Sequence, residues 1–180
     1  HIIQLGASLK HNRHFPAFYF QIMGYEDERR DDVLYGFPNS ILSYSVPSVS
    51  VPPWFAEGVA QFMYEGANFD YWDTHRDMVL RDAFLNGSVL NINQMNSFGK
   101  CGMGNELVYN HGYALVEYIV EVYGESALNK ISSSLSKPFN YSINRAIKES
   151  IGLTGDKLYD NWKEYLESRY SKQLDLVDEN

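Results

Sequence analysis

The most restrictive feature of the sequence is a segment over residues 108–123 in which apolar side chains recur at helical spacing. Two stripes run along this segment, one of Tyr109, Tyr113, Val116, Val120 and Tyr123 and the other of Leu115, Ile119 and Val122. A helix that is apolar over so much of its surface is buried in a globular protein. Gly124 follows and predicts the end of this helix.

The remainder of the chain predicts a mainly α-helical fold in one domain over residues 1–180. Helices are expected at residues 1–12, 16–23, 54–64, 74–87, 126–134 and 142–151, and again after Thr154, which is expected to cap the last helix. A short strand is possible only near residues 41–46, and residues 89–105 predict a loop. In the last helix, Leu158, Trp162, Tyr165 and Leu166 form one apolar stripe. Thr74 and Asp77 match a capping box.

Composition excludes several classes of protein. The net charge of −8 argues against a nucleic-acid partner, because phosphate binding requires a basic surface. The single cysteine, Cys101, can form neither an intrachain disulfide nor a cysteine-based metal site. No stretch approaches 18 apolar residues, so the sequence predicts no transmembrane segment.

Glu57 is the one charged residue in an apolar helical segment, Trp54-Phe55-Ala56-Glu57-Gly58-Val59-Ala60. The ordinary interpretation is a partly exposed carboxylate or one paired with a basic residue. The alternative is a metal ligand or a general base, since a charge in apolar surroundings needs a compensating partner.

Residue Tyr109 has two interpretations as well. It begins the segment Tyr109-Asn110-His111-Gly112-Tyr113-Ala114-Leu115, which we expect to place it in the first turn of the buried helix. One is a packing tyrosine with a satisfied hydroxyl, which is the ordinary interpretation when the segment is taken alone, and the other is a phenol placed where the helix meets a cleft.

Together the two segments resemble the gluzincins, the peptidase MA-like zinc metallopeptidases related to aminopeptidase N. In that family a His-Glu-x-x-His motif precedes a helix with glutamate in a Trp-Phe-x-Glu-Gly context, and a Tyr-x-x-Gly-aromatic-Ala-Leu helix comes later. The opening His1-Ile2-Ile3-Gln4-Leu5 resembles the residues that begin at the second motif histidine. The resemblance covers residues 1–170, and only the Glu57 and Tyr109 segments are specific.

The resemblance implies a Zn²⁺ site in which His1 and Glu57 are protein ligands and Tyr109 stabilises the oxyanion during peptide hydrolysis. The substrate would be a peptide or protein. His111, two residues after Tyr109, and Tyr113 are candidates for substrate contact. Large bacterial proteins of this type often carry further domains, which suggests an extracytoplasmic location in the periplasm or cell envelope.

The sequence departs from the family pattern in two places. The first motif histidine and the general-base glutamate would precede His1, and the interval between His1 and Glu57 is far longer than in the aminopeptidase relatives. We therefore expect residues 10–51 to loop out, and we expect the 180-residue chain alone to be inactive and poor in metal. A groove left by the absent segment would also favour self-association.

Two other functions stay open at this point. One is a peptidase-like binding or scaffolding module without catalysis, and the other is an unrelated helical interaction domain.

Of the remaining polar residues, His11, His14 and His75 are expected at the surface. Arg76 and Arg81 are expected to form surface ion pairs with Asp77 and Asp82.

Overall fold

The computed structural model describes residues 51–64, 74–96, 102–137, 140 and 142–178, and over these ranges the chain is mainly helical, as predicted. The helices are α4 (Pro53–Phe62), α6 (Thr74–Leu85), the short 3-10 helix η1 (Gln94–Asn96), α7 (Gly102–Tyr123), α8 (Ser126–Leu135), α9 (Ile143–Ile151) and α10 (Gly155–Asp178). The predicted helices at 1–12 and 16–23 and the possible strand at 41–46 lie outside the described residues.

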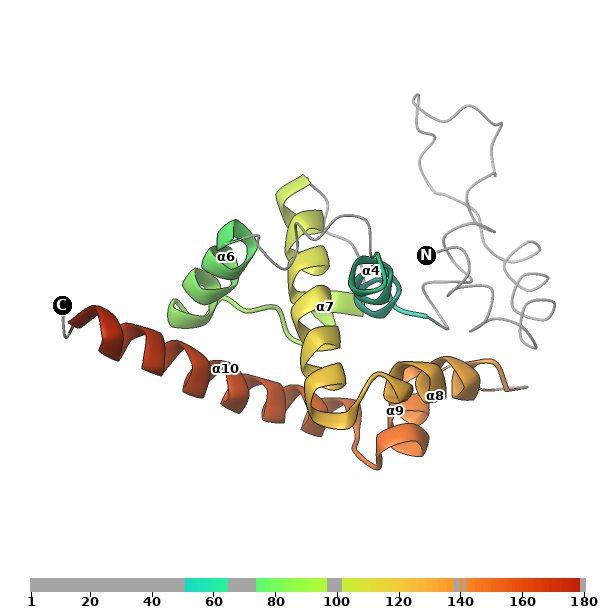
Figure 1. Ribbon diagram of the computed structural model, residues 1–180. Coiled ribbons are helices and arrows are strands. Elements are labelled where there is room, and N and C mark those ends of the chain that lie inside the picture. Colours follow the sequence, from blue (N-terminus) through green and yellow to red (C-terminus); the bar gives the residue numbers. More distant parts are fainter. Residues whose placement is uncertain (1–50, 65–73, 97–101, 138–139, 141, 179–180) are drawn as a thin grey trace, which may run out of the picture.

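Helix α7 is the central element. It contacts α4, α6, η1, α8 and α10, and Figure 1 shows α4 crossing it while α10 runs past its C-terminal end. Leu115, Val116 and Ile119 are completely buried, which confirms that α7 is a core helix. Val122 is 51% exposed, so the second predicted stripe is not buried to its end. Helical periodicity identifies a face, but it does not show where along that face the neighbouring helices stop.

The beginning of α7 was predicted too late. The helix starts at Gly102, so the predicted loop over residues 89–105 is wrong in its last part, and η1 occupies its middle. Tyr109 therefore lies in the third turn of α7 and not in the first. The glycines in this segment have poor intrinsic helix propensity, but packing routinely outweighs propensity. Val108, which is 1% exposed, is already part of the core here.

The α4–α7 crossing is unusually close because a glycine lies on each helix. A Cβ atom added at Gly58 would lie 2.4 Å from the carbonyl oxygen of Gly112, and one added at Gly112 would lie 2.5 Å from the carbonyl oxygen of Trp54. Both obstacles are backbone atoms, which cannot move aside as a flexible side chain can. The two helices can approach this closely only because neither position carries a side chain.

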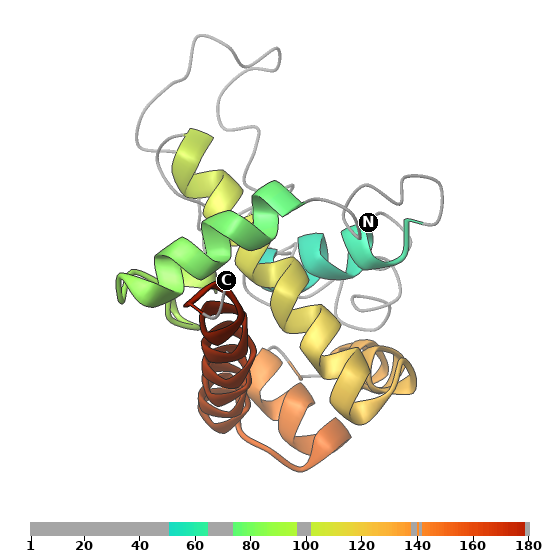
Figure 2. The same cartoon turned by 60° about the vertical axis from the view of Figure 1, so that its left-hand side comes forward.

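The C-terminal helices follow their sequence signals closely. Ser142 accepts a hydrogen bond from the backbone N–H of Arg145, α9 ends at Gly152 with φ +81°, and the Thr154 hydroxyl accepts from the N–H of Lys157 at the start of α10. Trp162 and Leu166 of α10 are buried against the rest of the core. Figure 2 shows α10 extending from α9 back to α6.

Helices α6 and α10 are joined by polar contacts that the sequence did not predict. Asp77 accepts hydrogen bonds from Tyr170 at 3.2 Å and from Arg169 at 3.0 Å, and Arg81 donates to Gln173 at 2.9 Å. The predicted pairs of Arg76 with Asp77 and of Arg81 with Asp82 are therefore wrong. Residues adjacent on one helix point in different directions, and the buried Tyr170 requires a partner for its hydroxyl.

We expect Gly112→Ala and Gly58→Ala each to lower the free energy of unfolding by about 1–3 kcal/mol, because each added methyl group forces the two helices apart. The double variant should lower the free energy of unfolding by clearly less than the two single variants do together. Helices that one methyl group has already separated can accommodate the second. Urea denaturation measures all three. Gly87→Asn is the control, because Gly87 has open space around it and asparagine tolerates its φ of +67°. Fully additive losses of stability would contradict the conclusion that both glycines serve the same contact between α4 and α7.

Candidate active site

Glu57 lies in the second turn of α4 on the side away from the core. Trp54, Phe55 and Val59 of the same helix are buried, whereas the Glu57 side chain is only partly exposed. Burial raises the pKa of the Glu57 carboxyl above its usual value, and a hydrogen bond from Tyr109 acts in the opposite direction. Glu57 is thus a carboxylate whose surroundings make its charge costly unless a partner compensates it.

Tyr109 provides the contact to Glu57 from the neighbouring helix. Its hydroxyl donates to the Glu57 carboxylate. Burial raises the pKa of the Tyr109 hydroxyl, and the negative charges of Glu57 and Glu106 raise it further. Tyr109 therefore stays protonated and remains a hydrogen-bond donor at neutral pH.

The glycine crossing explains why these two side chains meet. Glu57 immediately precedes Gly58, and Tyr109 lies three residues before Gly112, so each is within one turn of the point of closest approach. Each glycine thus has a structural role next to one of the two candidate site residues. The pattern Glu-Gly followed later by Tyr-x-x-Gly combines a polar residue with the glycine that places it.

The other two candidates on α7 differ from each other. His111 has no exposed surface, its Nδ1 lies 2.6 Å from the carbonyl oxygen of Leu107, and its ring packs edge-on against Trp162. Tyr113 is partly exposed and lies one turn after Tyr109 on the same side of α7. The environment of His111 is that of a core residue, with no surface open to a substrate.

The donor set of the described residues is incomplete for a metal ion. Within the described ranges, no group of three or more histidine, cysteine, aspartate or glutamate side chains could hold one. His1, which was predicted as a ligand, and His11 and His14 lie outside these ranges. Glu57 fits the requirement for one ligand, since it supplies a partly buried carboxylate whose charge a cation would stabilise.

Comparison with known proteins identifies the family. The family model of the Peptidase MA superfamily matches residues 40–168, a range that includes both the Glu57 and the Tyr109 segments. The search of curated proteins and the search of solved structures found no match. The chain belongs to the Peptidase MA superfamily, which confirms the resemblance drawn from its two motifs.

Membership in this superfamily indicates a metallopeptidase-like function with a peptide or protein substrate. The superfamily is generally zinc-dependent. Among the described helices, none combines the length and apolar character that a membrane span requires.

We expect the stability of the protein to fall as the pH drops below about 6.5, the ordinary pKa of histidine. Burial lowers the pKa of His111, so below that pH the unfolded chain binds a proton that the folded protein does not. His111→Phe should reduce this dependence by up to about 1.4 kcal/mol per pH unit. Urea denaturation of both proteins between pH 7.5 and 5.5 measures the difference. Parallel curves would show that His111 does not titrate differently in the two states.

Proposed function

We propose that the intact protein is a zinc-dependent peptidase in which Glu57 and His1 are metal ligands and Tyr109 stabilises the oxyanion. The observation that supports this most directly is the hydrogen bond between Glu57 and Tyr109, which joins two helices of a Peptidase MA domain. The remaining histidine ligand and the general-base glutamate would be encoded directly before His1, in the order His-Glu-x-x.

When bound, zinc polarises the scissile carbonyl and activates the attacking water. The residues of this chain have separate tasks around it. Glu57 contributes a carboxylate from the rigid helix α4, which keeps the ligand in place without a mobile loop. Tyr109 contributes a protonated phenol that can donate to the substrate carbonyl oxygen as negative charge develops there.

The contact between Glu57 and Tyr109 is compatible with both tasks. An ionised carboxylate has about four lone-pair sites, so Glu57 can accept a hydrogen bond and still offer an oxygen to a cation. Because Tyr109 lies beside the carboxylate that would hold the metal, its phenol would be available to a substrate carbonyl bound there. Neutralisation of Glu57 by a cation would weaken its hold on the Tyr109 proton and leave that donor available to the substrate.

In the intact protein, Glu57→Ala should abolish zinc retention, whereas Tyr109→Phe should keep zinc and lower kcat by about 10²–10³-fold. A ligand holds the metal in the resting state, while an oxyanion donor acts mainly in the transition state. Metal analysis and peptide hydrolysis measure the two effects. Glu106→Gln is the matched control, since this exposed carboxylate lies near Tyr109 without contacting the proposed metal.

Two outcomes would contradict these assignments. Equal zinc loss in the Glu57 and Tyr109 variants would mean that Tyr109 is not an oxyanion donor. An intact protein that binds no zinc and hydrolyses no peptide would instead be a peptidase-like binding module.

The 180-residue chain alone should retain little zinc after dialysis against a weak chelator. Only His1 and Glu57 of the proposed ligands are present in it, and two ligands cannot fix a tetrahedral site. Metal analysis of the purified chain tests this. Stoichiometric zinc would show that a complete site exists within these residues and would overturn the proposed ligand set.

A further inference from the structure

The face of α4 that carries Glu57 continues toward the C-terminal end of the helix as a strip of partly exposed residues. Glu57 and Gln61 are one helical turn apart, so they lie on one side of α4, and Tyr64 follows two residues after the end of the helix. The opposite side holds the buried residues Phe55 and Val59. Ala60, which is partly exposed, adds only a methyl group beside Gln61. The strip therefore extends from the proposed ligand Glu57 past Gln61 to Tyr64.

Gln61 is oriented by a residue from another helix. Arg76 of α6 donates from Nη1 to the Gln61 side-chain oxygen at 3.1 Å. Because guanidinium groups only donate, this contact determines which end of the amide is the oxygen and turns the Nε2 group away from Arg76. The result is a neutral side chain with two oriented N–H donors, which suits a main-chain carbonyl better than a charged group.

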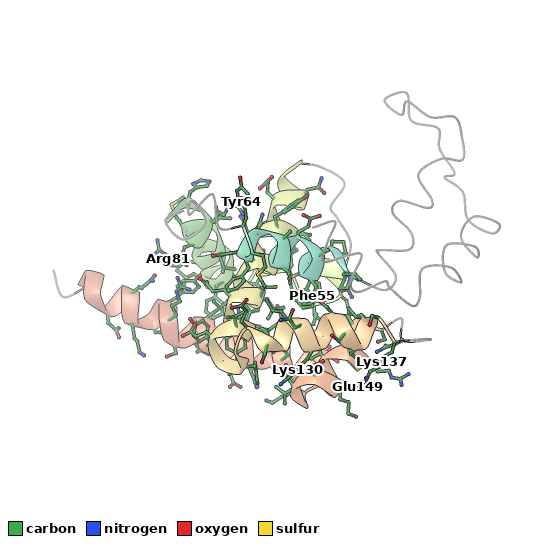
Figure 3. All side chains as sticks on the ribbon, turned by 45° about the vertical axis from the view of Figure 1, so that its right-hand side comes forward. Phe55, Tyr64, Arg81, Lys130, Lys137 and Glu149 are labelled. Atoms are coloured by element: carbon green, nitrogen blue, oxygen red, sulfur yellow. The ribbon has the colours of Figure 1, made fainter. Side chains whose placement is uncertain are left out.

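Tyr64 ends the strip just beyond α4. Its side chain is 62% exposed, and Figure 3 shows it on the opposite side of α4 from the buried Phe55. The backbone N–H of Tyr64 donates to the Gln61 carbonyl oxygen at 3.2 Å, which holds the Tyr64 backbone in a turn at the end of the helix. An exposed aromatic ring held in this way offers a flat apolar surface next to the amide donors.

We propose that this strip binds an extended peptide substrate, with Gln61 donating to a substrate carbonyl, Tyr64 packing against a substrate side chain, and Arg76 acting as the positioning residue for Gln61. This inference rests on the proposed peptidase function, since the strip leads away from Glu57. Seven residues at about 1.5 Å each span roughly 10 Å, which matches about three residues of extended peptide. The strip thus favours oligopeptides over dipeptides.

Binding to the intact, zinc-loaded protein tests the proposal, with two blocked peptides as probes. One is an alanine hexapeptide with a single phenylalanine, and the other is an alanine–phenylalanine dipeptide. Gln61→Glu keeps a partner for Arg76 but removes both N–H donors. It should raise the Kd of the hexapeptide about fivefold, the effect of one hydrogen bond, and leave the dipeptide unchanged.

The other variants separate the three roles. Arg76→Met should weaken hexapeptide binding to a similar degree, but it should add nothing when combined with Gln61→Glu, because a positioning residue acts only through its target. Tyr64→Ala should weaken binding of the hexapeptide and not of the dipeptide. Met63→Ala is the matched control, since Met63 is 44% exposed but lies on a different side of α4.

The outcomes distinguish a failure of the proposed peptide-binding strip from a failure of the proposed peptidase function. A hexapeptide Kd unaffected by Gln61→Glu, or equal losses for both peptides, overturns the strip even if the protein hydrolyses peptides. Hexapeptide binding that depends on Gln61 and Arg76 supports the strip even in a protein without hydrolytic activity, in which case only the proposed function fails. Absence of peptide binding to the unmodified protein overturns the strip as well.

Discussion

The close approach of α4 and α7 at Gly58 and Gly112 is the constraint on which the rest of this structure depends. A single methyl group at either position would collide with the backbone of the other helix. Contact at this distance brings residues within one turn of the crossing into hydrogen-bonding range. Glu57 and Tyr109 are such residues, and their contact is a direct consequence of the two glycines. The crossing therefore combines a packing function with the placement of the polar pair.

A partly buried carboxylate destabilises a fold, so the surrounding helices must hold it in place. Burial raises the pKa of Glu57, and the hydrogen bond from Tyr109 offsets part of that rise. Natural proteins tolerate such costs where a ligand later supplies the missing interaction. Membership in the Peptidase MA superfamily makes a metal cation the natural candidate for that ligand.

Helix α6 connects α4, the helix that carries Glu57, to the C-terminal helix α10. Its Arg76 reaches Gln61 on α4, while its next residue, Asp77, is held by Arg169 and Tyr170 of α10. Neighbouring residues on one helix point in different directions and can thus join two different partners. Through α6, the last helix of the chain helps to support the helix that carries Glu57. Contacts from neighbouring helices of this kind keep the residues of a polar site in fixed positions.

Several features of the protein followed from the sequence by itself, because they depend on short-range chemistry. The helical period of residues 108–123, the end of α9 at Gly152 and the Thr154 cap of α10 are local, and the structure has them as predicted. The two motifs were sufficient to indicate the family. The sequence also singled out Glu57 and Tyr109, because their two segments together resemble motifs of the family. Their roles in metal binding and catalysis stay predictions.

Only the tertiary structure decided how these helices meet. It extended α7 back to Gly102, exposed Val122, buried His111 against Trp162, and gave Asp77 partners on α10 in place of Arg76. Each of these depends on where a second helix lies, and periodicity determines the direction of a side chain without determining its neighbour. The contact between Glu57 and Tyr109 belongs to the same class. Its residues are far apart in the chain, and they come together because two glycines allow two backbones to touch.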